Sequence, residues 1–282
     1  MKYIFIFIML LYSTNSFTQN FFTSFYGGTS NYQGDLSESI FELKHTHPAW
    51  GLGLLFELNP HMLIRGDFTY GRLSASDADG SKNRSRNLSF TSSISEFSLA
   101  YEYVLLNLYD YKVSPYVFAG VGIFKFSPYT KDLNGNLASL YELSTEGQGF
   151  YEDRKKYKLT QMSIPFGGGV QWAISDNTRL GFVLGIRQTF TDYLDDVSKT
   201  YVDQDLLRAK RGGTAVTFAY RGNQLQNGAP YPADGVQRGN PTNPDWYYFS
   251  GLSLRVRLLS KKKRKMKSGR VERSRITCPR PI

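Results

Sequence analysis

The sequence predicts an all-β protein, namely an eight-stranded antiparallel transmembrane β-barrel of the outer-membrane type. Three observations predict it. In eight segments of about ten residues, apolar side chains alternate with small, polar or charged ones, which is the pattern of strands with two different faces. Short connections alternate with long ones along the chain. Aromatic residues make up 15% of the 282 residues and accompany 26 glycines, a composition that favours pleated sheet and membrane interface over helix.

Residues 1–19 have the pattern of a secretory signal peptide. Lys2 precedes an apolar run from Tyr3 to Tyr12, and small polar residues follow it. The run is too short to anchor the chain by spanning a membrane, and it holds no cysteine for lipoprotein processing. We expect cleavage near Thr18 or Gln19; the alternative is an N-terminal core strand. The rest of the chain then divides into a barrel at 20–259 and a basic tail at 260–282.

The last alternating segment shows the two faces clearly. Leu252, Leu254 and Val256 fall on one face, whereas Arg255 and Arg257 fall on the other. A soluble sandwich would rarely bury two such arginines. Segments 21–29 and 115–126 are harder to phase than the others. The eight predicted strands are residues 21–29, 49–58, 62–73, 92–104, 115–126, 160–174, 178–190 and 246–259.

Each segment therefore has an aliphatic and aromatic face and a face of Gly, Ser, Arg and Glu. In a membrane barrel the first face meets lipid and the second fills the lumen. Eight strands leave an interior just wide enough for side chains, so we expect opposite charges to pair there and plug it. The alternative is a soluble sandwich or lipocalin-like barrel whose apolar face points inward. The predicted lumen ion-pair network comprises Glu57, Asp67, Glu96, Glu102, Arg65, Arg179, Arg187, Arg255 and Arg257.

The connections favour the membrane barrel. Residues 59–61, 105–114 and 175–177 are short joins, whereas residues 30–48, 74–91, 127–159 and 191–245 are long ones. Short periplasmic turns and long surface loops are typical of outer-membrane barrels. Because the strand number is even, we expect both termini at the periplasmic rim, and closure leaves no sheet edge unpaired in lipid.

Local features of the predicted strands lead to further predictions. Pro165 removes a ladder hydrogen bond, so we expect a bulge there. Gly167-Gly168-Gly169 lacks the Lys-Ser/Thr of a phosphate loop, and we expect it to relieve crowding or bend the barrel wall. Aromatic residues near segment ends are expected to form interfacial girdles: Tyr70, Tyr101, Tyr103, Tyr116, Phe126, Tyr247 and Tyr248.

The net charge of +10 comes almost entirely from the tail. Residues 261–282 hold ten basic residues and one acid, giving +9, which leaves 24 basic and 23 acidic residues for the rest, giving +1. We expect the tail either to be a disordered, solvated end or to tether the barrel to an acidic periplasmic partner or the anionic cell wall. Nucleic acid is not an expected partner on the exported side. The candidate partner-binding residues are Lys261, Lys262, Lys263, Arg264, Lys265 and Lys267.

The sequence predicts no catalytic, cofactor-binding or metal-binding residue, and no small-molecule substrate. The only cysteine, Cys278, lies in the tail, so no intramolecular disulfide can form. His45 and His47 lie in a long loop without a carboxylate or thiol at useful spacing for a metal, and without a nucleophile motif for a hydrolase. The acidic stretch of Asp192, Asp195, Asp196, Asp203 and Asp205 lacks the spacing of a calcium loop. We expect solvated turn and capping carboxylates there; calcium is the alternative.

Six stretches of the chain carry a family resemblance: 31–36 (NYQGDL), 89–96 (SFTSSISE), 115–120 (PYVFAG), 145–149 (TEGQG), 164–167 (IPFG) and 189–198 (TFTDYLDDVS). They resemble the PorG-type outer-membrane barrels of Bacteroidota, and the resemblance covers roughly residues 20–259. It implies an outer-membrane protein that serves type IX protein secretion without catalytic residues, beside periplasmic ring or lipoprotein components. The alternative is a small passive channel or envelope-integrity barrel with no secretion role; a surface lipid-modifying enzyme is a third, remoter one.

Overall fold

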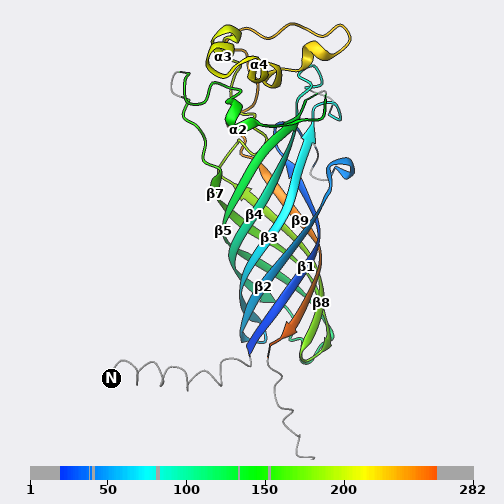
Figure 1. Ribbon diagram of the computed structural model, residues 1–282. Helices are drawn as coiled ribbons and strands as arrows, with labels where there is room; N and C mark the ends of the chain where they lie inside the picture. The colour runs from blue at the N-terminus through cyan, green and yellow to red at the C-terminus, as the bar shows by residue number, and fades with distance from the viewer. Residues whose placement is uncertain are drawn as a thin grey trace, which may run out of the picture.

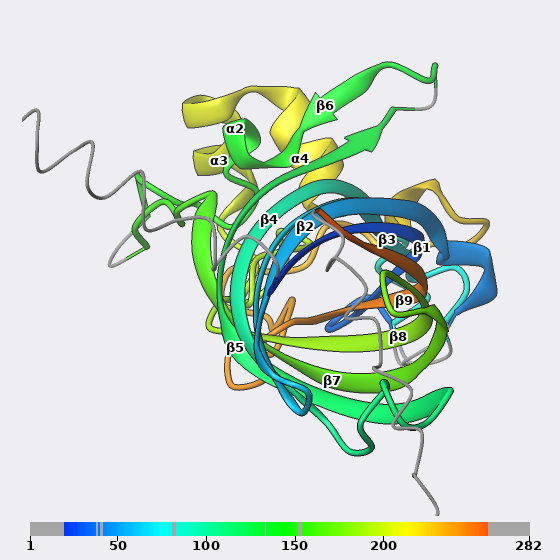
Figure 2. The same ribbon diagram turned by 90° about the horizontal axis from the view of Figure 1, so that it is seen from below.

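The computed structural model shows a closed antiparallel β-barrel (Figure 1). It describes residues 20–37, 39, 42–80, 83–132, 134–151 and 154–258. Eight strands pair in the order β4-β3-β2-β1-β9-β8-β7-β5, and pairing between β4 and β5 closes the ring. Seen along its axis, the barrel is a continuous ring of strands (Figure 2). Closure pairs the backbone groups that an open sheet would leave at its edges.

All eight predicted strands are present, and several extend beyond their predicted ends. The barrel strands are β1 (Phe21–Gln33), β2 (His47–Asn59), β3 (Met62–Ser76), β4 (Ser89–Val104), β5 (Val113–Lys131), β7 (Thr160–Ser175), β8 (Thr178–Thr189) and β9 (Trp246–Arg257). A short strand, β6 (Leu137–Ser139), adds to the outer end of β5. The prediction of the fold class is therefore confirmed. The predicted signal peptide at 1–19 and the tail at 260–282 lie outside the described residues.

Connections are short at one end of the barrel and long at the other, as predicted (Figure 1). We call these the inner and outer ends. The long connections contain the helices η3 (Leu43–His45), α2 (Leu140–Leu143), α3 (Gln204–Arg211), α4 (Gly213–Ala219) and η4 (Gly222–Gln224). They fold over the outer end as a cap. None of the helices in the described part of the chain is long and apolar enough to cross a membrane.

The apolar face of each strand points outward, as the alternation predicts. On β4, Phe97 is 67% exposed, whereas the neighbouring Glu96 is fully buried. Leu252 on β9 is likewise 58% exposed beside the buried Ser253. A soluble sandwich or calyx would have the opposite arrangement, so the alternative with an inward apolar face is wrong.

The lumen layer nearest the inner end is built around Glu57. Its carboxylate contacts Arg179 Nη2 at 2.9 Å and Arg257 Nη2 at 3.4 Å. The hydroxyl of Tyr109, between β4 and β5, donates to Glu57 at 2.6 Å. The three charged groups are almost completely buried. Each therefore depends on its partners for the interactions that water would otherwise provide.

The middle layer is built around Glu102. Arg255 donates to both of its oxygens, at 2.5 and 3.0 Å, and Arg65 donates at 3.2 Å. Arg65 also pairs with Asp67 at 2.6 Å, and the Gln171 amide donates to Glu102 at 2.8 Å. This layer thus neutralises two carboxylates with two guanidinium groups.

The outer layer and the aromatic side chains complete the filling. Glu96 pairs with Arg187 at 3.1 Å and accepts a hydrogen bond from the Tyr247 hydroxyl. Every lumen arginine also lies over an aromatic ring, which adds a cation–π attraction. The pairs are Arg179 and Arg257 over Phe22, Arg65 over Phe118, Arg187 over Phe249, and Arg255 over Tyr116.

A small internal cavity remains in the lumen. It has a volume of about 30 Å³ and is lined by Ser24, Arg65, Asp67 and Arg255 among others. Such a volume holds about one water molecule. The lumen is thus filled by side chains of the barrel.

The expected bulge at Pro165 is wrong. Pro165 lies opposite Arg187, between Ile164 opposite Gln188 and Phe166 opposite Ile186, so the register runs past it without a shift. The register shifts of the β7–β8 and β2–β3 pairs lie beside the inner turns, at residues 173–175 and 57–59. A turn absorbs an extra residue at little cost, whereas a bulge in mid-wall would turn the following side chains to the wrong face.

The glycine run does relieve crowding, as predicted. A Cβ atom on Gly169 would lie 1.9 Å from the Phe182 carbonyl oxygen and 3.0 Å from the Tyr116 ring. The glycine therefore gives Tyr116 room to lie inside the barrel wall.

The girdle prediction is wrong for three aromatic residues. Tyr101 and Tyr103 point outward and are 44% and 41% exposed. In contrast, Tyr116, Phe126 and Tyr247 point inward and are buried. They lie on the lumen side of β5 and β9, where alternation places every second residue.

We expect Glu102→Gln to destabilise the barrel by about 3–5 kcal/mol, because it leaves the buried Arg255 without its carboxylate partner. Denaturant unfolding of the protein in lipid vesicles measures the free energy of unfolding.

The matched control is Glu142→Gln in the outer loops. The Glu142 side chain is 70% exposed and lies 3.6 Å from Lys156, so its removal should cost less than about 1 kcal/mol. Equal losses for the two variants would show that the lumen pairs contribute no special stability.

Candidate functional site

The outer mouth of the barrel is closed by the segment that follows β8. Leu194 and Val197 are almost completely buried and belong to one apolar cluster with Phe90, Phe126 and Tyr247 from the strands. The predicted long loop therefore folds back onto the barrel. Hydrophobic burial holds it there, and the polar groups between the two apolar residues are carried into the interior with them.

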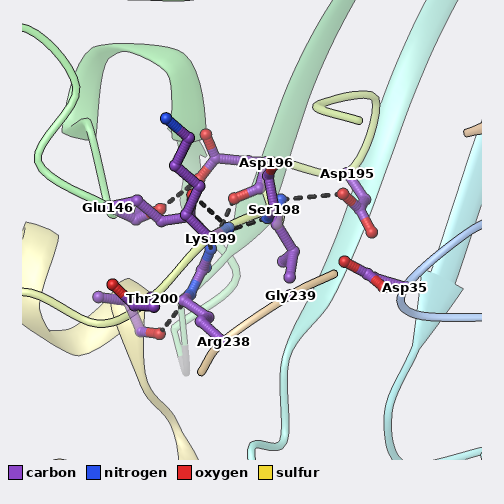
Figure 3. A network of polar contacts seen from close by, with 12 residues as sticks. Asp35, Glu146, Asp195, Asp196, Ser198, Lys199, Thr200, Arg238 and Gly239 are labelled. Atoms are coloured by element: carbon purple, nitrogen blue, oxygen red, sulfur yellow. Dashed lines mark hydrogen bonds and ion pairs between the residues drawn. The ribbon is translucent and has the colours of Figure 1, made fainter. Parts of the chain in front are cut away.

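Arg238 and Glu146 connect the segments of this cap (Figure 3). The guanidinium group of Arg238 donates to Glu146 at 2.9 Å and to the Asp196 carbonyl oxygen at 2.6 Å. The backbone amides of Ser198 and Lys199 donate to Glu146 at 2.9 and 3.1 Å. Both charged groups are buried. One ion pair thus joins three separate stretches of chain.

A second buried pair lies beside the first. Arg86 donates to the two oxygens of Asp77 at 3.1 and 2.7 Å and to the Asp35 carbonyl oxygen at 3.0 Å. The Asp35 carboxylate accepts from the Asn240 amide at 2.7 Å. These contacts fasten the loop between β3 and β4 to the ends of two other loops.

The Tyr32 hydroxyl lies between two buried carboxyl groups. It is 2.7 Å from Asp195 Oδ2 and 2.7 Å from Asp245 Oδ1. The other oxygens of these groups accept from the amides of Val197 and Leu194. A hydroxyl carries one proton, so it can donate to only one of the two groups. A proton on one of the carboxyl groups would satisfy the second contact and would leave the pair with less than its full charge of −2.

Burial raises the pKa of four acidic residues at the mouth, namely Asp192, Asp195, Asp196 and Asp245. It raises the pKa of Asp195 and Asp245 well above the ordinary value. The pKa of Asp196 rises to about 7 through burial, although Arg238 lowers it. The pKa of Asp192 rises to about 9 through burial and the neighbouring Asp195. We call Asp192, Asp195, Asp196 and Asp245 the mouth acids.

The expectation of solvated carboxylates in this stretch is wrong for three of its five members. Asp192, Asp195 and Asp196 are buried because the loop folds into the mouth. Asp203 does cap a helix, accepting from the Leu206 amide of α3 at 2.8 Å. Asp205 is exposed and lies 3.4 Å from Arg208. Within the described residues, no three His, Cys, Asp or Glu side chains are placed to hold a metal ion.

The structure also places the two histidines beside a serine, which the sequence did not show. His45 Nδ1 lies 3.0 Å and His47 Nε2 lies 2.7 Å from Ser74 Oγ, and His45 Nε2 lies 3.0 Å from Asp79. Ser74 is buried in the strand β3. These contacts fasten the turn before β2 to the outer end of β3.

All nine residues of the predicted lumen network lie in the lumen, in the three layers described above. The structure brings each of them within 3.4 Å of an oppositely charged partner. Tyr109 and Gln171 also bond to this network, but they do not stand out in the sequence because neither carries a charge that the alternation could single out. The candidate partner-binding residues 261–267 lie outside the described residues.

We expect the cap to loosen as the pH rises from about 4 to about 9. Because the pKa of Asp192 is raised in the folded state, that state binds more protons than the unfolded one, and stability falls between the unfolded and folded pKa values. Hydrogen exchange of the amides at 192–199, corrected for the intrinsic exchange rate at each pH, measures the opening.

Asp192→Asn should weaken this pH dependence, because the amide cannot ionise, whereas the other mouth acids keep their contribution. Asp205→Asn removes an exposed carboxylate from the same stretch and should leave the dependence unchanged. Protection that is independent of pH in the unaltered protein would contradict the assignment of protons to the mouth acids.

Comparisons with solved structures find other barrels. Neisserial surface protein A has a TM-score of 0.42 at 10% identity, covering 84% of this chain and 97% of that one. A major outer-membrane protein of Thermus thermophilus has 0.40 at 12%, covering 84% and 98%. The attachment invasion locus protein Ail of Yersinia pestis has 0.38 at 11%, covering 83% and 97%. No curated protein sequence matches the chain.

One family model matches the sequence directly. It covers residues 1–215 and is described as a domain of unknown function. The matched part contains the strands β1 to β8 and the segment that closes the mouth. Because the match spans well over half of the residues, the chain belongs to the DUF6089 family.

Proposed function

We propose that this protein is an outer-membrane β-barrel that acts without catalysis, as a structural or assembly component of the type IX protein secretion system. The observation that carries the proposal is a barrel that is apolar outside and filled inside. On β5 every second residue from Val113 to Ile123 is apolar and faces outward, and this stretch is eleven residues long. At about 3.3 Å per residue and a tilt of about 40°, they span roughly 28 Å, close to the apolar band of membrane barrels.

The filled lumen supports a scaffold more than a passive channel. Three layers of ion pairs cross it, and the mouth acids and their apolar neighbours close its outer end. A solute would have to separate buried charges from their partners, which costs about 3–5 kcal/mol for each pair. The lumen cavity has a volume of about 30 Å³, which is room for about one water molecule. The channel remains the alternative that a transport measurement tests.

The secretion role rests on the resemblance to PorG-type barrels. The stretch 189–198, which is the most specific part of that resemblance, packs into the mouth through Leu194 and Val197. The partners we propose are periplasmic ring or lipoprotein components of the secretion machine. The tail residues Lys261 to Lys267 would attract an acidic partner, and such attraction weakens as salt is added.

We expect Phe182→Lys to destabilise the protein in lipid vesicles by about 2–4 kcal/mol, because Phe182 lies in the middle of the outward face of β8 and would place a charge in lipid. Denaturant titration of the vesicle-bound protein measures the loss.

Leu43→Lys is the matched control, since Leu43 is 90% exposed in the outer loops and its change should cost less than about 0.5 kcal/mol. If the mature protein stays monomeric in water without detergent, the membrane placement is wrong.

Deleting the gene should abolish export of type IX cargo while leaving envelope permeability unchanged, because the barrel is a part of the machine and conducts nothing. Cargo in the medium and uptake of a small dye measure the two effects. The purified protein should release no trapped solute from liposomes; release would support the channel instead.

Removing residues 261–282 tests the tail separately. The truncated protein should still insert but should lose salt-sensitive co-purification with periplasmic ring components. Full co-purification of the truncated protein would show that the tail is not the tether.

A further inference from the structure

Charged side chains are rare on the outward faces of the eight barrel strands, and all of them are cationic. Along the described strands only Arg72 on β3 and Lys125 and Lys131 on β5 carry a charge on that face. All three lie towards the outer end. The outward faces of β3, β4 and β5 hold no carboxylate at any described position.

The register places Arg72 and Lys125 on either side of a pair of serines on β4. Arg72 is opposite Ser93, and Ser95 is opposite Lys125. The two cations are thus two strands apart, about 10 Å across the sheet, with both serine side chains between them. β3, β4 and β5 run side by side on this wall (Figure 1). We call Arg72, Ser93, Ser95 and Lys125 the outer-wall patch.

The patch lies where the apolar surface ends. The next outward residues towards the inner end are Tyr70, Phe97 and Ile123, and Phe97 and Ile123 are 67% and 56% exposed. Towards the outer end the outward residues include Thr91 and Ser127. The patch therefore marks the level at which acyl chains give way to headgroups.

Both cations are available to a ligand. Arg72 and Lys125 are exposed, and within the described part of the chain neither forms an ion pair. An arginine binds phosphate oxygens with two parallel hydrogen bonds, and a lysine contributes a compact charge. The serine hydroxyls can donate to the same oxygens.

We propose that the outer-wall patch binds the phosphate-bearing headgroup of a glycolipid in the outer leaflet. The proposal rests on the proposed outer-membrane placement. Two cations without ion-pair partners among the described residues lie where the apolar outer surface ends, and serine hydroxyl groups lie between them. At their described positions, the outward faces of β3, β4 and β5 hold no carboxylate that would compete for these cations.

The test uses the mature protein in phosphatidylcholine nanodiscs, with lipid A, with dephosphorylated lipid A, or with phosphatidylglycerol added. Retention of the added lipid is measured by native mass spectrometry. We expect lipid A to be retained, and the R72Q/K125Q variant to bind it about tenfold more weakly. The variant K112Q/K210Q loses the same charge at the inner turn and on α3, and should bind lipid A like the unaltered protein.

Equal retention of dephosphorylated lipid A or phosphatidylglycerol would overturn the proposal, as would unchanged lipid A binding by R72Q/K125Q. Gel mobility before and after heating checks that each variant is a folded barrel. Failure of the unaltered protein to enter nanodiscs would instead contradict the membrane placement. The two failures are therefore distinguishable.

Discussion

The charges inside the barrel must find their partners inside it, because the outer faces of the same strands are apolar. Arginines on β8 and β9 reach carboxylates on β2 and β4, so these ion pairs connect strands that are not neighbours in the barrel. Arg65 on β3 instead pairs with Asp67 on its own strand and with Glu102 on the adjacent β4. Aromatic rings cover the other faces of the guanidinium groups. The network that satisfies the buried charges is therefore also what fills the interior.

Buried carboxyl groups must also be neutralised at the outer mouth, where the arginines are fewer than the acids. Two arginines, Arg86 and Arg238, neutralise Asp77 and Glu146 there. The mouth acids are left without a cation of their own, and burial raises their pKa values. Ion pairs hold the lumen, whereas the cap also contains buried acids whose pKa values are raised, so the two regions should respond differently to pH.

The filled interior leaves the ends and the outer wall as the surfaces that can meet partners. At the outer end the long loops and short helices form a cap whose apolar core continues into the barrel. On the wall, the few outward cations lie at the end of the apolar belt. The surfaces left for lipids and for the proposed partners are therefore the outer wall and the two ends of the barrel.

The sequence by itself determined the eight strands and the content of the lumen. One face of every strand meets an apolar medium and the other meets charged groups, so the alternation that encodes this difference is local and visible. The nine charged residues on the polar faces had only the lumen to point into, and the structure places all of them there. The sequence did not show that Tyr116 points inward, because both faces of its segment carry apolar residues.

Only the tertiary structure decided the closure of the mouth. The contacts of Ser198 with Glu146 and of Tyr32 with Asp245 join residues 52 and 213 positions apart. Such contacts depend on where a long loop packs, and they produce no periodic pattern of residues in the sequence. Acidic residues that would be solvated in an extended loop are buried here, because the neighbouring Leu194 and Val197 pack into the mouth of the barrel.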